Sequence, residues 1–176
     1  MYGNFQYDYY KDKMYFFIGA HESYKLNDDI SNYYVEFDKN EVFDSHDYVE
    51  ETITNIGEGR IIKLDSPLLE NSNTIVLSDI NSRTVNLKRN SDNKLIASTT
   101  FKDFPNLLLW HSLGSKMICI EPWMNNPDSP SDYEKELKDK KNVLFINPSE
   151  EKTLIRTITY YVEEEEITWQ KLIKLQ

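Results

Sequence analysis

The sequence is built from short apolar or alternating segments, each of strand length and each closed by polar turn residues. The clearest alternation lies in "YYVEFD" (33–38), and the last stretch, "NVLFINPSEEKTLIRTITYYV" (142–162), is divided by turn residues at 147–150. Further segments cover residues 14–20, 60–65, 73–80, 83–89, 94–101, 106–113 and 116–121. Most of these segments are divided by short polar turns, a spacing that favours an all-β fold over alternating βα units. The pattern predicts an all-β fold, an antiparallel β-sandwich.

The composition agrees with a sheet protein that forms one domain. Aromatic residues make up 13% of the 176 residues, and twelve residues are Tyr, a type that strands favour. The length supports one sizeable core, and the chain contains no internal repeat and no Gly/Ser linker. We therefore expect one domain over residues 1–161, followed by an acidic and then amphipathic tail over residues 162–176.

Two segments leave room for helix. The stretch "SPSDYEKELKDKK" (129–141) predicts one or two helical turns, capped by Ser131 with Glu134 three residues later. The tail "VEEEEITWQKLIKLQ" (162–176) is either an extra amphipathic helix or an extended segment, because its run of four glutamates repels itself. Both alternatives for the tail stay open at this point.

Charge and cysteine content restrict the partners and the compartment. Thirty acidic residues against 20 basic ones give a net charge of −10, which repels phosphate backbones. The single cysteine, Cys119, cannot form an internal disulfide, so nothing requires an oxidising compartment. The apolar stretch 14–20 lacks a basic leader and is too short to span a bilayer. We expect a cytoplasmic protein with no nucleic-acid partner and no membrane partner.

Several kinds of reactive site are excluded by residue type. One cysteine and three widely spaced histidines give no metal-ligand spacing, and the five glycines form no phosphate-binding loop. A serine nucleophile elbow is also missing. We therefore expect no metal and no cofactor, which leaves acid–base catalysis or plain binding.

The three histidines differ in their surroundings. His46, in "FDSHDY" (43–48), is predicted to be a solvated turn residue. His111 is predicted either to face water or to contact a ligand from a loop. His21 follows an apolar run and two small residues, which would let another group approach its imidazole. It is either a structural histidine or, beside a carboxylate, an acid that works near neutral pH.

Glu121 is the carboxylate that could act with His21. The apolar run 117–120 leads directly to Glu121 and ends at Pro122. Glu121 is either a strand end that points into water or a catalytic base at the mouth of a rigid β-scaffold. In the second case burial would raise its pKa and improve it as a base near neutral pH.

Two long motifs stand in order along the chain. The first is "MYFFIGAH" (14–21) followed by "YYVEF" (33–37), and the second is "FPNLLLWHSLGSKMICIEPW" (104–123) followed by Asp128. Together they resemble the aldose 1-epimerase (galactose mutarotase) family, and within it the LacX-like branch, which carries "GAH" and "FPxLxxW…CIEPW" in this order. The resemblance runs from about Met14 to about Tyr161. It implies the β-supersandwich of that family, in which two large antiparallel sheets pack face to face.

The resemblance also implies residue roles. His21 matches the general acid of the family and Glu121 its general base, for the interconversion of α and β anomers of a free hexose without a cofactor. Glu70 stands where the family has an aspartate that hydrogen-bonds a sugar hydroxyl, with one more methylene group. Trp123 is implied to stack on the pyranose or to fill the core. Asp128 matches the aspartate after "EPW" and contacts the sugar or caps the loop.

The chain departs from the family mainly at its front. Family members are considerably longer, and the part before "MYFFIGAH" contributes strands, an arginine and a second histidine to the sugar pocket. The resemblance therefore covers the C-terminal part of the family only. In addition, Glu22 stands where the branch has a proline, and "MNNPDSP" (124–130) replaces a loop that carries a glycine.

These features leave three classes of function open. The first is a mutarotase for a neutral aldohexose, with activity reduced because the pocket is open on one side. A phosphosugar substrate ranks below a neutral one, because cationic residues such as Arg60 and Lys116 are scattered. The second class is a non-catalytic carbohydrate-binding protein, and the third binds a partner through the tail or a sheet edge. Exposed sheet edges also favour a homodimer.

Overall fold

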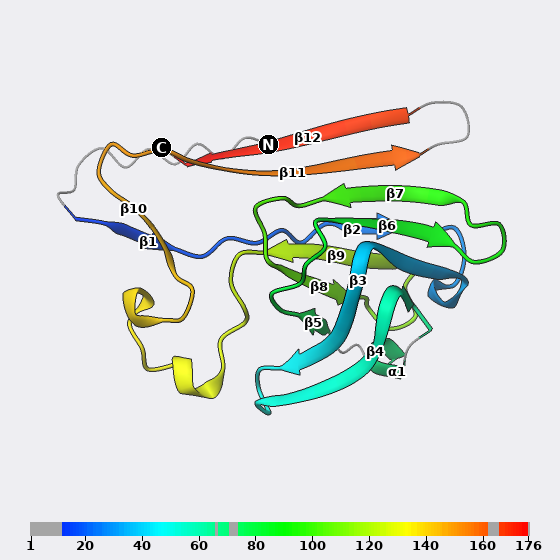
Figure 1. The fold of residues 1–176 in the computed structure, drawn as a ribbon, viewed down its shortest axis with the longest axis horizontal. Helices are drawn as coiled ribbons and strands as arrows, with labels where there is room; N and C mark the ends of the chain where they lie inside the picture. The colour runs from blue at the N-terminus through cyan, green and yellow to red at the C-terminus, as the bar shows by residue number, and fades with distance from the viewer. Residues whose placement is uncertain (1–11, 66, 71–73, 162–165, 176) are drawn as a thin grey trace.

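The computed structural model describes residues 12–65, 67–70, 74–161 and 166–175, with all of their side chains except those of residues 68, 70 and 166–175 (Figure 1). The strands are β1 (Met14–Phe16), β2 (Ser23–Lys25), β3 (Tyr33–Asp47), β4 (Thr52–Lys63), β5 (Ile75–Leu77), β6 (Thr84–Arg89), β7 (Leu95–Thr100), β8 (Asn106–Trp110), β9 (Met117–Trp123), β10 (Leu144–Ile146), β11 (Lys152–Tyr161) and β12 (Glu166–Leu175). The short helices are α1 (Pro67–Glu70), η1 (Ile30–Asn32), η2 (Pro130–Asp132) and η3 (Leu137–Asp139). No helix in these ranges has the length and hydropathy needed to cross a membrane.

Ten of the strands belong to one antiparallel sheet. Its strand order is β12-β11-β7-β6-β3-β5-β8-β9-β2, and β4 joins it through a long hairpin with β3. Strands β1 and β10 form a separate antiparallel pair, at the left of Figure 1. The predicted all-β antiparallel class is confirmed.

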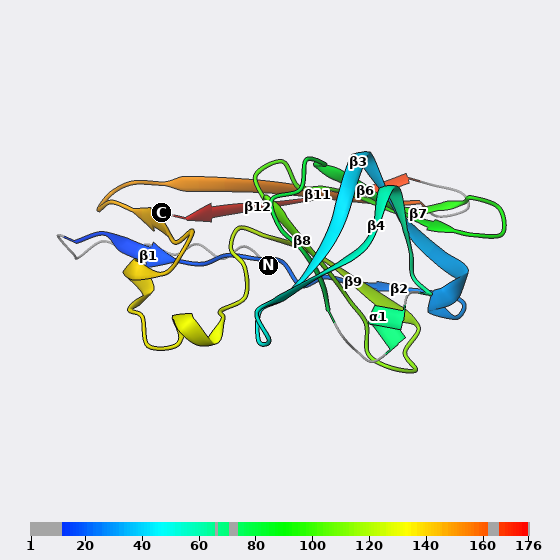
Figure 2. The ribbon, with the colours of Figure 1, turned by 60° about the horizontal axis from the view of Figure 1, so that its bottom comes forward.

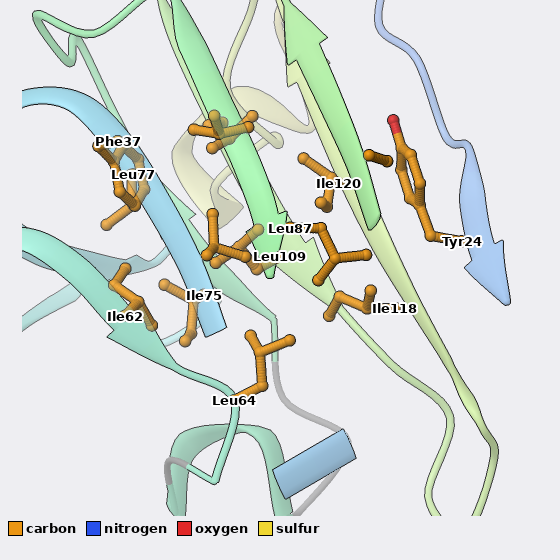
Figure 3. Close-up of a cluster of buried hydrophobic side chains, with 14 of the residues drawn as sticks. Tyr24, Phe37, Ile62, Leu64, Ile75, Leu77, Leu87, Leu109, Ile118 and Ile120 are labelled. Atoms are coloured by element: carbon orange, nitrogen blue, oxygen red, sulfur yellow. The ribbon is translucent and has the colours of Figure 1, made fainter. Parts of the chain in front are cut away.

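The large sheet curls until its two ends face each other across the core. Tyr24 lies on β2, at one end of the strand order, yet its hydroxyl is 2.6 Å from the hydroxyl of Thr99 on β7. The Tyr24 ring also lies 5.8 Å from that of Tyr160 on β11. The buried apolar cluster fills the space between the two halves, with side chains such as Leu87 and Ile120 meeting inside it (Figure 3). The layers of the predicted sandwich are therefore two halves of one sheet.

The long strand β3 bends on its way across the sheet. Its first part pairs with β6, whereas near its end it pairs with β5 through Ser45 alone. Its register with β4 shifts at two places near Gly57 and Gly59, whose φ angles are 135° and 117°. Residues with a side chain rarely adopt such angles, so the two glycines permit the bend. The bend carries the end of the β3–β4 hairpin away from the body of the sheet (Figure 2).

The hairpin corrects one expectation from the sequence. Residues 43–48 do not form a turn; β3 runs through them to Asp47, because β4 lies alongside as a hairpin partner. The aspartates and the histidine made this segment resemble a turn, since strands are depleted in Asp. His46 is accordingly a half-buried strand residue and not a solvated turn residue.

Two further expectations concern helix. The predicted helical turns within 129–141 are present as the short helices η2 and η3, but the predicted cap is wrong, because the cap of η2 is Ser129 with Asp132. The Ser129 amide donates to the Asp132 carboxylate at 3.2 Å, so Ser131 and Glu134 are not the capping pair. In the tail, β12 pairs with β11 along its whole length, which rules out a helix over 166–175. The division of the chain at residue 161 stays a prediction.

The sheet edges lead us to expect a homodimer in solution. Among the described strands, β2 and β12 end the strand order and β4 pairs with β3 alone, so each presents an unpaired edge. Val42, Ile53 and Ile61 also expose 59%, 62% and 50% of their surface on the hairpin. Sedimentation equilibrium should give twice the 20.9 kDa chain mass. Ile53→Lys should shift the population to monomer, and a wild type that stays monomeric at every concentration would contradict the expectation.

Candidate active site

His21 lies directly across from Glu121. The segment before β2 continues alongside β9, and the backbone pairs Gly19 with Trp123 and Ser23 with Cys119 fix its register. The midpoint of this register is His21 opposite Glu121. The backbone hydrogen bonds lie at the flanking positions, from Ala20 N to the Pro122 carbonyl and from Ile120 N to the Glu22 carbonyl. The two side chains thus occupy a pair without backbone hydrogen bonds, the kind in which cross-strand side chains come closest.

The two side chains are in direct contact but differ in burial. Nδ1 of His21 is 2.7 Å from Oε1 of Glu121. The imidazole is 63% exposed, whereas the carboxylate side chain is only 4% exposed. The buried carboxyl group of Glu121 therefore contacts an imidazole that a ligand can reach from solvent. The Trp110 ring packs against the imidazole in an edge-to-face arrangement, with ring centroids 5.8 Å apart and ring planes at 66°.

The surroundings of Glu121 favour its protonated form. Leu108 on β8 is its cross-strand partner, and burial raises the pKa of Glu121 above the usual value of 4.5. The positive charge that His21 can carry partly offsets this increase. Loss of hydration destabilises the charged form of Glu121, whereas a nearby imidazolium stabilises it. A carboxyl group in this balance holds its proton at higher pH than an exposed one, as a general base near neutrality requires.

Pro122 explains the position of the Trp123 side chain. In an antiparallel pair such as Ala20 with Pro122, the two residues normally exchange two hydrogen bonds. Pro122 has no N–H, so it accepts from Ala20 N at 3.0 Å but cannot donate back to the Ala20 carbonyl. The indole Nε1 of Trp123 donates to that carbonyl at 3.0 Å instead. The consecutive residues Pro122 and Trp123 therefore fix the indole beside the pair.

Gly19 gives the indole the space it needs. A Cβ atom at this position would lie 2.7 Å from both Cδ1 and Cγ of Trp123. The indole therefore lies flat against the Gly19 backbone, where only a residue without a side chain fits. The sequence led us to expect that the small residues admit a close approach to the imidazole. At Gly19 the approaching group is Trp123, which packs on the backbone, whereas the ring against the imidazole is that of Trp110.

A cleft of about 350 Å³ opens at the His21–Glu121 pair. It is lined by His21, Thr74, Val76, Leu108, Trp110, Glu121, Trp123 and Pro127. Apolar and aromatic side chains form most of the wall, with His21 and Glu121 as the main polar feature, which is the usual character of a small-molecule site. Our sequence analysis missed Thr74, Val76, Leu108 and Trp110. The alternation along β8, in which Leu108 and Trp110 share a face, was the available signal.

Glu22, which departs from the resemblance, has a structural partner. Its carboxylate pairs with the guanidinium of Arg156 on β11, and Arg156 is only 2% exposed. Burial lowers the pKa of Arg156 to about 10. Because Glu22 follows His21 directly, this ion pair attaches the His21 segment to the opposite half of the curled sheet.

The other two histidines lie outside the pair. His111 is buried, with Nε2 2.6 Å from the Leu69 carbonyl and Nδ1 3.0 Å from the Ser112 carbonyl. It connects α1 to the end of β8, so the expectation that it faces water or a ligand is wrong. The His46 ring stacks on Tyr48 at 5.8 Å, beyond the cleft on the β3–β4 hairpin.

The remaining predicted site residues are placed as follows. Asp128 is partly exposed and its carboxylate pairs with Lys140, in the loop after β9. It does not line the cleft at the pair. The backbone of Glu70 ends α1, but its side chain lies outside the described residues, so its role stays a prediction.

Within the described residues, one cluster has the composition of a metal site. His21, Cys119 and Glu121 each offer a ligand atom, and these atoms all lie within 4.8 Å of one another. Spacing along the sequence did not reveal this cluster, because the sheet register brings its members together. A metal bound there would displace the proton that His21 and Glu121 share, so it would compete with the pair.

Solved structures provide the comparison with known proteins. A galactose mutarotase related enzyme from Lactobacillus acidophilus matches 89% of the chain at 19% identity, with a TM-score of 0.70. A galactose mutarotase-like protein from Lactobacillus casei matches 93% at 15% identity, with a TM-score of 0.64. The chain shares their fold. A protein from Synechocystis sp. PCC 6803 matches 78% of the chain at 17% identity, with a TM-score of 0.54.

The match is partial in length. The chain spans 55% of each of the two Lactobacillus structures and 42% of the third. No protein-family model matches the sequence, and no curated protein is similar enough to match it. The galactose mutarotase-like fold is thus established, and the chain represents about half the length of the solved structures that share it.

Proposed function

We propose that the protein interconverts the α and β anomers of a free aldohexose, using Glu121 as base and His21 as acid. The observation that carries this proposal is the 2.7 Å contact between an exposed imidazole and a buried carboxylate at a cleft. The fold of mutarotase-related proteins and the neutral walls of the cleft support the same chemistry. As part of this proposal the protein works in the cytoplasm, which suits its single cysteine.

The geometry suggests how protons move in the reaction. Oε1 of Glu121 holds Nδ1 of His21, which leaves Oε2 to accept the proton of the anomeric hydroxyl. Nε2 of His21 then donates a proton to the ring oxygen, and the bond between C1 and the ring oxygen breaks to give the free aldehyde. Rotation about C1–C2 and the reverse proton transfers close the ring on the other face. One proton is taken and one is given, so the site returns to its starting state.

Polarimetry tests the proposal directly. Fresh α-D-glucose and α-D-galactose should lose their initial rotation faster with the protein than without it. A second candidate is a non-catalytic sugar-binding protein, favoured by the coverage of only 55% of the Lactobacillus structures. For that candidate, sugar titrations followed by NMR would show binding while the rate of mutarotation stays at the uncatalysed value.

The raised pKa of Glu121 predicts the pH dependence of the activity. The base must be deprotonated, so kcat/KM should fall as the pH falls through the pKa of Glu121. Because burial raises that pKa, the midpoint should lie above 4.5. The measurement is kcat/KM by polarimetry from pH 4 to pH 8, corrected for the uncatalysed rate. A profile that stays flat below pH 4.5 would contradict the assignment of Glu121 as the base.

A further inference from the structure

Three side chains that can bind a metal meet on one face of the sheet. Cys119 and Glu121 are two residues apart on β9, so their side chains point to the same face. Ile118 and Ile120 point to the other face and are buried in the core. His21 lies opposite Glu121 and diagonal to Cys119, within cross-strand reach of both. A ring nitrogen, a thiol sulfur and a carboxylate oxygen of these three residues all lie within 4.8 Å of one another.

The chemistry of the three donor groups favours zinc over other common divalent ions. Imidazole, thiolate and carboxylate are ordinary zinc ligands, with bond lengths of about 2.0–2.3 Å. Mg²⁺ and Ca²⁺ bind mainly through oxygen, and the cluster offers only one oxygen-bearing group, the carboxylate of Glu121. The thiolate and the carboxylate together carry two negative charges, which balance the charge of Zn²⁺. The complex therefore brings no net charge into the buried wall of the cleft.

The spacing requires only small movements to fit the ion. Around a tetrahedral zinc ion, neighbouring ligand atoms lie roughly 3.3–3.8 Å apart. Nδ1 of His21 and Oε1 of Glu121 are 2.7 Å apart and must separate slightly, while Sγ of Cys119 must lie in the same range. The exposed imidazole can make this adjustment, whereas β9 fixes the backbone of the other two ligands. The cluster can therefore close around one ion without a change in strand pairing.

Neighbouring groups orient the ligands, and the cleft provides the fourth position. The Ser23 hydroxyl lies 3.2 Å from Sγ of Cys119. Trp110 on β8 is the cross-strand partner of Cys119 and packs against the His21 imidazole. Such outer contacts fix the direction of metal ligands. Because His21 and Glu121 line the cleft, water can complete the coordination from that side, as in a zinc site with three protein ligands.

We propose that His21, Cys119 and Glu121 bind one Zn²⁺ ion, and that this ion inhibits the His21–Glu121 pair. The ion takes the place of the thiol proton and of the proton between Nδ1 and Oε1. The thiol proton leaves to solvent, and the second proton leaves or moves to Nε2 of His21. A carboxylate bound to a dication attracts a proton poorly, so Glu121 can no longer act as the base. Metal binding does not depend on the proposed function; the loss of mutarotation rests on it.

Cobalt spectroscopy tests the site in the full chain, untagged and freed of metal with a chelator. Co²⁺ occupies zinc sites and gives a near-ultraviolet charge-transfer band when a thiolate binds it. The chain has a single cysteine, so this band reports on Cys119. We expect the band to saturate at one Co²⁺ per chain and to disappear when Zn²⁺ displaces the cobalt. The Kd for Zn²⁺ should be about 1 μM or below, weaker than that of a closed site with four protein ligands.

Substitution of single ligands locates the ion. Cys119→Ser should abolish the band and weaken Zn²⁺ binding by about 100-fold or more, because losing a direct ligand should exceed the effect of losing an outer contact. His21→Ala should weaken binding by a similar factor, and its exposed position keeps the test valid if Cys119→Ser does not fold. His46→Ala is the matched control. It removes a histidine on β3 that does not line the cleft, so the band and the affinity should stay unchanged.

Polarimetry measures the inhibition, with each protein compared with and without Zn²⁺. Saturating Zn²⁺ should lower kcat/KM of the wild type for α-D-glucose by about 100-fold or more, the usual contribution of a general base, and EDTA should restore it. The rate of Cys119→Ser should not respond to the same Zn²⁺ concentration. Zn²⁺ bound at the site without loss of turnover would overturn the inhibition.

The outcomes separate this inference from the proposed function. A folded wild type without the cobalt band, or an affinity for Zn²⁺ that is equal in wild type and Cys119→Ser, would overturn the site and leave the mutarotase proposal intact. Absence of turnover in the metal-free wild type would contradict the mutarotase proposal. The cobalt band and the zinc affinities of the variants would still decide on the metal site in that case.

Discussion

Glu121→Gln should lower kcat for mutarotation by about 10²–10⁴-fold, the usual contribution of a positioned general base. Glutamine has the shape of glutamate but cannot take a proton from the anomeric hydroxyl near neutral pH. The amide can still face Nδ1 of His21, now 2.7 Å from Oε1, so the cleft should keep its form. The measurement is polarimetric mutarotation of α-D-glucose at saturating sugar, together with sugar affinity by NMR titration. We expect the affinity to change only a few-fold while turnover disappears.

Glu58→Gln is the matched control for this substitution. It makes the same chemical change on β4, at an exposed position away from the cleft, and should leave kcat unchanged. An active wild type whose Glu121→Gln variant keeps more than a tenth of its turnover would contradict the role of Glu121. Loss of sugar binding together with turnover would point to a carboxylate that orients the sugar and not to a base.

His21 and Glu121 could be named as candidates from the sequence, but their contact could not. His21 and Glu121 are separated by most of the chain, and their meeting depends on the register between the segment before β2 and β9. A shift of one residue would turn one of the two side chains to the other face of the sheet. Periodicity predicts the strands themselves. It does not predict which strands pair or in which register they do so.

The long β3–β4 hairpin was the main error in the fold, and it has a physical cause. Beyond Phe43, which still packs in the core, the segment around His46 is polar because its neighbours are the β4 hairpin and an open cavity. Apolar alternation reports burial on one face, so a strand that leaves the body of the sheet loses that signal. His46 and Tyr48 of this segment line that cavity, at positions where a strand buried on both faces would carry aliphatic residues.

The role of Trp123 could have been derived from "PW" together with the glycine. A proline inside a strand removes one backbone donor and leaves a carbonyl on the neighbouring strand without its partner. The next residue is a tryptophan, and its indole N–H can only donate a hydrogen bond, so it needs an acceptor such as this carbonyl oxygen. What the sequence could not give is that Gly19 stands opposite Trp123, because that again depends on the register.

Gly19→Ala should reduce the free energy of unfolding by about 1–3 kcal/mol, the typical cost of overpacking. Elsewhere, a change from glycine to alanine at a compatible backbone position stabilises a protein by restricting the unfolded chain. Here the new Cβ would lie 2.7 Å from the Trp123 ring, so the indole must move away from the Ala20 carbonyl. That carbonyl belongs to a residue only 6% exposed, and leaving it without its donor is costly. The rate of mutarotation should also decrease, because the displaced indole of Trp123 lines the cleft.

A double-mutant cycle with Trp123→Ala isolates the cause of this loss. If the alanine methyl group destabilises the protein by displacing the indole, removal of the indole removes the conflict. Gly19→Ala should then be neutral or slightly stabilising in the Trp123→Ala background, whereas it is destabilising in the wild type. Urea denaturation followed by circular dichroism measures all four free energies of unfolding. An equal loss in both backgrounds would mean that the Gly19 position is strained for a reason other than Trp123, and the account of the Pro122–Trp123 pair would have to be abandoned.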